Sequence, residues 1–212
     1  AKSEYFDALY EAASEWSDAE SALELGEISA AALGSCLEWM YVGAVPVVDD
    51  AALAVLLEAS AYLQMESLLE AAATAMRDRL GPSTVLRAWA VAERQSLAVL
   101  ASDACTVACR HFLAVTTSAE WASAPGAIVH VLLGDDRLAI SSEEDAYRAA
   151  LAWLRARTPP LAAADAARLL SLVRFSLCSR AFFADVVRQE PMLRTPEGHA
   201  LLIDALQETL TG

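Results

Sequence analysis

The sequence predicts a mainly α-helical protein, and three observations support that fold class. About a fifth of the 212 residues are alanine and leucine comes next, so the intrinsic preference is helical along the chain. Apolar residues make up 56% of the chain, which is enough for a sizeable core and too many for a disordered chain. Caps, glycines and prolines divide the sequence into helix-length segments with short connections. We therefore expect antiparallel helices stacked as hairpins.

The first 80 residues contain four predicted helices and one or two short predicted strands. The helices are expected over 4–13, 30–42, 50–63 and 67–80, and a strand over 21–25, where the sequence SALEL alternates. Ser29 is placed to cap the second helix, and Gly43 to end it in a left-handed conformation. Residues 44–48 should be extended, because Pro46 disfavours the helical conformation at Val45.

The rest of the chain contains predicted helices only. They are expected over 83–95, 97–114, 125–133, 143–157, 162–173, 180–189 and 196–210. Ser142 precedes an acidic first turn, and Thr195 precedes a proline and an acid at a second helix start. Gly81-Pro82 is the best candidate boundary, so we expect one domain over 1–80 and another over 81–212.

Charge and hydropathy exclude several classes of partner. The 15 basic and 29 acidic residues give a net charge of −14, which has the wrong sign for nucleic acid or an anionic membrane surface. No apolar run approaches the roughly 18 residues of a membrane span, and residues 1–16 lack a signal-peptide pattern. We expect no nucleic-acid partner and no membrane insertion.

The four cysteines are scattered, which suggests a cytoplasmic or other intracellular reducing compartment rather than a disulfide framework. Cys105 and Cys109 share a helix face, and His111 follows them closely. A structural metal site normally needs four ligands with accessible thiolates. We favour the simpler interpretation, in which both cysteines are small hydrophobic residues of a buried stripe. No metal and no cofactor are expected.

Catalytic motifs are absent from the sequence. It contains no Gly-rich phosphate loop, no nucleophile elbow and no paired-histidine metalloprotease helix. The histidines at 111, 130 and 199 are isolated from one another. The acidic groups at 135–136 and 143–145 lack the alternating ligands and the turn glycine of a calcium loop. These observations favour a protein-interaction module over an enzyme.

Two sets of short matches carry a resemblance to known domains. The first set is residues 37–43 (LEWMYVG), 56–59 (LLEA), 62–65 (YLQM) and 68–71 (LLEA), which are similar to the C-terminal half of a BTB (POZ) domain. The second set is residues 88–90 (AWA), 135–136 (DD), 141–144 (SSEE), 150–154 (ALAWL) and 173–175 (VRF), which resemble a BACK domain. The order and spacing are those of Kelch-like BTB–BACK proteins. The resemblance implies part of an α/β BTB domain followed by an all-α BACK domain.

The resemblance also implies two missing parts. Residues 3–13 resemble the second helix of the BTB domain, so we expect the preceding strands and first helix to be absent from this chain. The family's homodimer surface lies largely in that part. A strand over 21–25 would then lack a partner strand to satisfy its backbone. No Kelch repeat follows the BACK-like segment.

Partner-binding residues are expected from the family's cullin-binding signature, which is an apolar residue, any residue and a glutamate. The matching positions are Ala32, Leu33 and Gly34, so the anchor is small and the carboxylate is missing. Tyr41 keeps the aromatic residue of the motif, either as a partner contact or as a packed residue at the helix end. Trp121 lies among serine, alanine and proline, and we predict that it is exposed and contacts a partner.

The resemblance implies a BTB–BACK adaptor that links a cullin-RING ubiquitin ligase to its substrate. The alternative is a non-catalytic scaffold subunit of a larger intracellular assembly in which cullin binding has been lost. The altered signature favours this alternative. A helical enzyme unrelated to the family is a third, weaker hypothesis.

Overall fold

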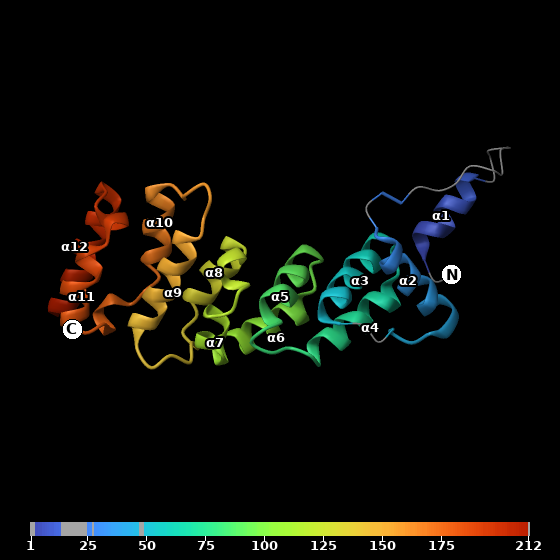
Figure 1. Cartoon of the computed structure of the whole chain (residues 1–212), viewed down its shortest axis with the longest axis horizontal. Helices are drawn as coiled ribbons and strands as arrows, with labels where there is room; N and C mark the ends of the chain where they lie inside the picture. Colours follow the sequence, from blue (N-terminus) through green and yellow to red (C-terminus); the bar gives the residue numbers. More distant parts are fainter. Residues whose placement is uncertain (1–2, 14–24, 27, 47–48, 212) are drawn as a thin grey trace. The chain divides into compact units, whose positions relative to one another are not determined.

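The computed structural model describes residues 3–13, 25–26, 28–46 and 49–211 of the chain. The protein is mainly α-helical, and the described residues contain no strand. The predicted strand over 21–25 lies outside these residues except for Leu25, which is in an irregular segment. The chain forms two compact units, Ala1–Ala104 and Cys105–Gly212, whose helices are labelled in Figure 1.

The first unit is built around helix α3, which packs against α2, α4 and α5. Its helices are α1 (Glu4–Ala13), α2 (Ala30–Val42), α3 (Asp50–Tyr62), α4 (Glu66–Arg77) and α5 (Val85–Arg94), followed by α6 (Ala98–Arg110), which continues into the second unit. Four of these helices match the ranges predicted for 1–80 to within a few residues. Of the segment predicted to be extended over 44–48, residues 44–46 are not helical, and Val47 and Val48 lie outside the described residues.

The ends of these helices are fixed by local polar contacts. The Ser29 hydroxyl accepts a hydrogen bond from the backbone N–H of Ala32 at 3.2 Å. The Asp49 carboxylate accepts one from Ala52 at 2.7 Å. Gly43 has φ of +77°, the left-handed conformation that a glycine adopts without steric cost at a helix C-terminus. Both the cap at Ser29 and the stop at Gly43 are therefore confirmed.

The core of the first unit is made of leucine, methionine and small residues. Its fully buried members include Leu53, Leu56, Leu57, Leu63, Met65 and Leu68. Ser3 joins α1 to this core, because its buried hydroxyl donates to the carbonyl oxygen of Leu63 at 2.6 Å. The Ser3 hydroxyl also accepts a hydrogen bond from the N–H of Phe6, which satisfies the first turn of α1.

The described residues of the second unit form the end of α6, six further α-helices and four short 3₁₀ helices. After the end of α6 they are α7 (Phe112–Thr116), η1 (Trp121–Ser123), α8 (Gly126–Leu133), α9 (Glu143–Arg155), α10 (Ala163–Leu170), η2 (Phe175–Leu177), α11 (Arg180–Asp185), η3 (Val187–Gln189), η4 (Pro191–Leu193) and α12 (Pro196–Thr211). The single helix predicted over 97–114 is interrupted at His111. The helix predicted over 180–189 ends at Asp185 and continues as a 3₁₀ turn.

An aromatic cluster forms the core between α9 and the C-terminal helices of this unit. The rings of Tyr147 and Phe182 meet edge to face with centroids 5.6 Å apart. The ring centroid of Phe175 lies 5.9 Å from the ring centroids of both Tyr147 and Phe183. A second contact joins α9 to the preceding segment, because the indole N–H of Trp153 donates to the carbonyl oxygen of Ala124 at 2.9 Å. Burial of such large rings is a major stabilising contribution in a helical unit.

Both buried glutamates among the described residues of the second unit have partners. Glu143 is buried, and its carboxylate accepts a hydrogen bond from the backbone N–H of Arg174 at 3.0 Å. Glu190 is also buried, and its carboxylate forms an ion pair with Arg155, whose Nη2 lies 2.7 Å from Oε2 of Glu190. Among the helices of the described residues, none has the length and apolar character that a bilayer span requires.

Candidate protein-interaction surface

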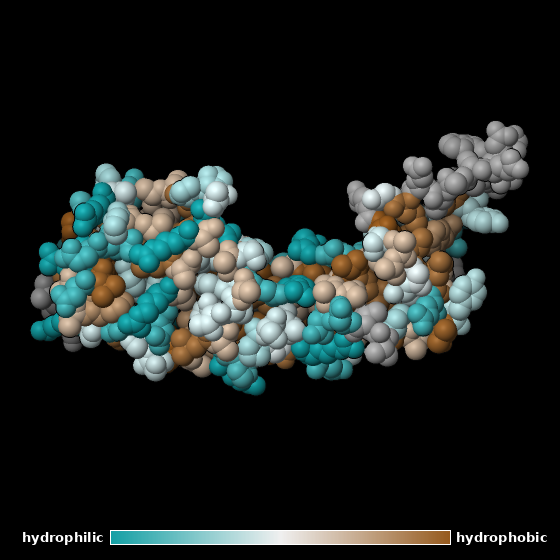
Figure 2. All heavy atoms as spheres, in the orientation of Figure 1, coloured by the Kyte–Doolittle hydropathy of each residue, from teal (hydrophilic) through white to brown (hydrophobic). Residues whose placement is uncertain are grey.

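Helix α2 exposes apolar side chains along one face. Leu33, Leu37 and Tyr41 are spaced four residues apart, so they follow one another along that face. Leu33 is half-buried, Leu37 is 40% exposed and Tyr41 is 88% exposed. We call these three residues, together with Gly34, the α2 surface. Figure 2 shows hydrophobic surface in the region of α2 and α3 of the first unit.

The three signature positions differ in what they offer a partner. Ala32 is buried and belongs to the core of the first unit. Leu33 packs against that core while keeping part of its side chain at the surface. Gly34 is exposed, and a Cβ added there would meet no atom within 4 Å. The surface around position 34 is therefore open, but no carboxylate occupies it.

Tyr41 lies in the last turn of α2 and is almost fully exposed. A side chain packed against the helix end would be buried, so that interpretation is wrong. Val42 beside it is 67% exposed, which extends the apolar area toward Gly43. Exposed tyrosine is frequent at interface hot spots, so Tyr41 remains a predicted partner contact.

Trp121 does not have the predicted exposure. It lies in η1 and is 2% exposed, and its indole N–H donates to the carbonyl oxygen of Ala149 at 3.0 Å. Its ring also packs edge to face on Phe112 at a centroid distance of 6.4 Å. The small polar neighbours misled the prediction because the 3₁₀ turn places Ala122 and Ser123 outside and directs the indole inward. Trp121 is a core residue in this structure.

A hollow of about 340 Å³ lies beside the N-terminal end of α2. Its lining comes from the start of α2, one face of α3 and the end of α5, and consists of Ile28, Ser29, Ala32, Val55, Glu58, Ala59, Tyr62, Arg94 and Gln95. The Arg94 guanidinium pairs with the Glu58 carboxylate at this site. The hollow therefore combines apolar walls with one ion pair.

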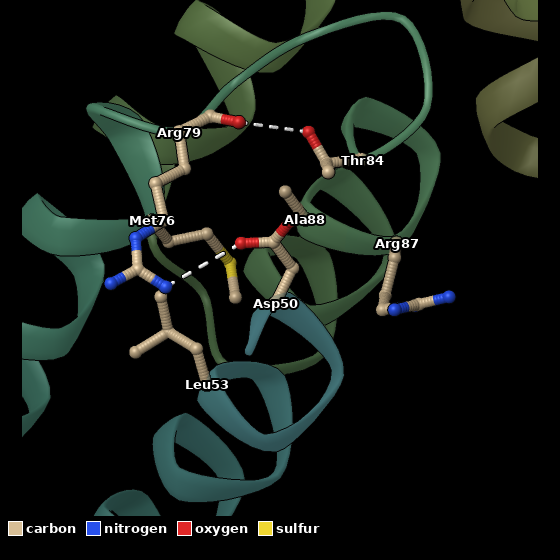
Figure 3. Close-up of a pocket in the computed structure, with 7 residues that line it drawn as sticks. All are labelled: Asp50, Leu53, Met76, Arg79, Thr84, Arg87 and Ala88. Carbon is tan, nitrogen blue, oxygen red and sulfur yellow. Dashed lines mark hydrogen bonds and ion pairs between the residues drawn. The ribbon is translucent and has the colours of Figure 1, made fainter. Parts of the chain in front are cut away.

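A second depression, between α3, α4 and α5, is nearly filled by side chains (Figure 3). Its free volume of about 10 Å³ is no more than one water molecule needs. The Arg79 guanidinium lies 3.5 Å from the Asp50 carboxylate, and the Thr84 hydroxyl donates to the Arg79 carbonyl oxygen at 2.9 Å. These contacts join the start of α3 to the connection between α4 and α5. We therefore interpret this depression as a packing contact rather than a ligand site.

Sequence reasoning missed Leu37 and the hollow. Leu37 lies four residues before Tyr41, and this spacing was the signal that could have placed it on the same face. The hollow depends on residues that are up to 67 positions apart, from Ile28 to Gln95, and no local pattern indicates it.

Two family models match the chain. One, described as BTB/POZ domain, matches residues 1–80, and the other, described as BACK: BTB And C-terminal Kelch, matches residues 85–188. Kelch-like protein 17 of Mus musculus is 30% identical over 207 residues, which are 97% of this chain and 32% of that protein. Kelch-like protein 2 of Homo sapiens is 27% identical over 192 residues, 91% of this chain and 32% of that protein. Kelch-like protein 35 of Mus musculus is 31% identical over 166 residues, 78% of this chain and 29% of that protein. The chain thus spans about a third of the length of these relatives.

Proposed function

The chain belongs to the BTB–BACK family of Kelch-like proteins, whose domains are protein-interaction modules, and on that premise we propose that it is an adaptor of a cullin-RING ubiquitin ligase. In this proposal the α2 surface contacts the cullin, and substrate is recruited elsewhere in the whole protein. The observation that supports it most is the exposure of Leu37 and Tyr41 on the helix that carries the signature positions.

The apolar part of the proposed contact is Leu33, Leu37 and Tyr41. Tyrosine supplies a large and rigid contact area at low conformational cost, which is why it is enriched among residues that dominate binding energy. Leu33 and Leu37 continue that area along α2 toward the hollow. These side chains replace the apolar anchor that buried Ala32 does not supply.

The polar part of the proposed contact is Glu38. It is exposed and lies one helical turn after Gly34, on the same face of α2. Four residues correspond to a displacement of about 6 Å along the helix axis. We propose that the Glu38 carboxylate makes a polar contact of its own with the partner, one turn away from the position where the glutamate of the signature is missing.

A scaffold role without cullin binding is the second candidate. It is favoured by two of the three signature positions, because Ala32 is buried and Gly34 has no side chain. In that case the α2 surface would bind a different protein of the assembly. A homodimer through the BTB domain is compatible with both candidates.

We also propose two domains, over 1–80 and 81–212. The compact units divide later, after Ala104, and α5 is in the first unit because it packs against α3. The free state of all four cysteines supports an intracellular reducing compartment for the protein.

The test is a calorimetric titration of the natural full-length protein with the N-terminal domain of a cullin of the BTB-binding type. A dissociation constant in the micromolar range or tighter supports the adaptor. No detectable heat from a protein that is folded by circular dichroism rejects the adaptor and leaves the scaffold. The full-length protein is used because this chain spans only about a third of the length of its relatives.

A further inference from the structure

Three potential metal ligands meet in the second unit, whereas the α2 surface belongs to the first. The sulfur atoms of Cys105 and Cys109 and a carboxylate oxygen of Asp135 all lie within 4.8 Å of one another. The Cys105 thiol lies 3.6 Å from Oδ2 of Asp135. Both cysteines are buried, and Asp135 is half-buried. The residues come from different parts of the chain, α6 and the segment after α8.

The fold holds this cluster together from two sides. Cys105 and Cys109 are one turn apart on α6, so their side chains point to the same face. The segment after α8 crosses this end of α6, where the N–H of Ala139 donates to the carbonyl oxygen of Cys109 at 2.9 Å. That bond fixes the segment carrying Asp135 over the two thiols.

We propose that Cys105, Cys109 and Asp135 form a binding site for a thiophilic divalent cation such as zinc. Tetrahedral zinc with bonds of about 2.3 Å to sulfur and about 2.1 Å to oxygen places a sulfur and an oxygen ligand about 3.6 Å apart. The measured separation of the Cys105 sulfur and Asp135 Oδ2 is 3.6 Å. The three residues between the cysteines fall within the spacing found for zinc ligands.

Arg137 controls the carboxylate of this site. Oδ1 of Asp135 accepts hydrogen bonds from the backbone N–H and from Nε of Arg137, both at 2.9 Å. Nη2 of Arg137 lies 2.7 Å from Oδ2 and 3.7 Å from the Cys105 sulfur. The guanidinium therefore places a positive charge at the mouth of the cluster and holds the pKa of Asp135 well below its usual range.

A cation can replace the outer part of that guanidinium. The Arg137 side chain is 64% exposed, so Nη2 is free to move toward solvent while the bonds to Oδ1 keep the carboxylate oriented. In this arrangement Oδ2 of Asp135 binds the metal, and Oδ1 keeps its hydrogen bonds to Arg137. Metal-bound carboxylates commonly have such a second hydrogen-bond partner. A hollow of about 250 Å³ next to Cys109 and Arg137 provides entry and room for a water molecule as the fourth ligand.

The simplest competing interpretation is the one favoured from the sequence, in which Cys105 and Cys109 are only small hydrophobic residues of a buried stripe. The Asp135 carboxylate, with Oδ2 3.6 Å from the Cys105 sulfur, gives this part of the stripe a charged neighbour that an apolar packing role does not need. A bound divalent cation would supply the positive charge that stabilises two thiolates beside that carboxylate.

The experiment is a titration of the reduced, metal-free chain with Co²⁺, followed by displacement with Zn²⁺. We expect one Co²⁺ per chain, with the thiolate charge-transfer absorption and the visible bands of tetrahedral cobalt, and loss of both signals on adding Zn²⁺. Cys105→Ser should weaken Zn²⁺ binding by at least about 100-fold, since even loss of an outer partner costs about 10- to 100-fold. Cys178→Ser, which removes a buried thiol outside the cluster, should leave binding unchanged.

Asp135→Asn keeps the test decisive if a cysteine variant fails to fold, because the amide preserves the shape of the carboxylate. We expect it to weaken Zn²⁺ binding about 10- to 100-fold with an unchanged circular dichroism spectrum. The proposal is overturned if the wild-type chain gives no thiolate–cobalt absorption. It is equally overturned if Cys105→Ser and Asp135→Asn bind Zn²⁺ as tightly as the wild type.

Discussion

Substitutions of Gly34 test the stability of α2 and its binding to a partner independently of each other. Gly34 is the fifth residue of a 13-residue helix, is exposed, and has no atom within 4 Å of an added Cβ. Glycine in an exposed helix interior is less favourable than alanine by about 1 kcal/mol. Because nothing obstructs the new methyl group, Gly34→Ala should gain nearly all of that amount.

The two variants at this position should differ in binding. Gly34→Glu restores the signature carboxylate, although repulsion from Glu38 one turn away should reduce its stability gain by a few tenths of a kcal/mol. A charge-assisted hydrogen bond contributes about 1.5–3 kcal/mol, which corresponds to roughly 10- to 100-fold in affinity. We therefore expect Gly34→Glu to bind the cullin domain more tightly than Gly34→Ala by that factor.

The assays are thermal unfolding and calorimetric titration of wild type, Gly34→Ala and Gly34→Glu side by side. For a chain of this size a gain of about 1 kcal/mol should raise the Tm of Gly34→Ala by roughly 2–4 °C. Gly34→Ala is the matched control, because it supplies the helix preference without the carboxylate. A lower Tm for Gly34→Ala would refute the packing argument, and equal affinities of the two variants would refute the proposed contact at this position.

Three further predictions concern a core hydrogen bond, the proposed carboxylate and a buried thiol. Trp121→Phe removes the indole N–H that donates to the carbonyl oxygen of Ala149, so urea unfolding should show a loss of about 0.5–1.5 kcal/mol from that bond, whereas an unchanged midpoint would mean that the indole bond contributes nothing. Glu38→Gln should weaken cullin binding about tenfold in the titration without changing the Tm, and equal binding would remove Glu38 from the proposed contact. Burial raises the pKa of Cys36 from its ordinary value of 9.0 to about 11, so its stabilising effect is complete below pH 9 and is lost as pH rises to 11. The free energy of unfolding should therefore fall more steeply between pH 9 and pH 11 in the wild type than in Cys36→Ala. The same pH dependence of that free energy in both proteins would contradict the raised pKa of Cys36.

Much of the fold follows from local signals in the sequence. The caps at Ser29 and Ser142 lie where the sequence placed them, since each hydroxyl accepts a backbone N–H of the first turn. The interruption at His111 was not predicted, because neither a glycine nor a proline marks it. The Cys109 carbonyl, just before that point, accepts a hydrogen bond from Ala139, and such a tertiary contact has no local signature.

The candidate sites could be predicted only in part. A motif comparison places Tyr41 on a helix, but its exposure depends on what packs around α2 and had to come from the structure. Trp121 shows the opposite error, because polar neighbours in sequence do not prevent a side chain from pointing inward. The pairing of Cys105 and Cys109 with Asp135 joins residues 30 and 26 positions apart, and only the folded chain brings them together.

The central claim is that the α2 surface binds the partner, and two tyrosines test it directly. Tyr41 is 88% exposed on α2, and Tyr10 is 82% exposed on α1 of the same unit. Calorimetric titration of the full-length wild type, Tyr41→Ala and Tyr10→Ala with the cullin N-terminal domain compares equally exposed side chains at the two places. We predict that Tyr41→Ala weakens binding at least about tenfold while Tyr10→Ala does not, because truncating a hot-spot residue costs about 2 kcal/mol or more. Equal affinities for the two variants would contradict the claim.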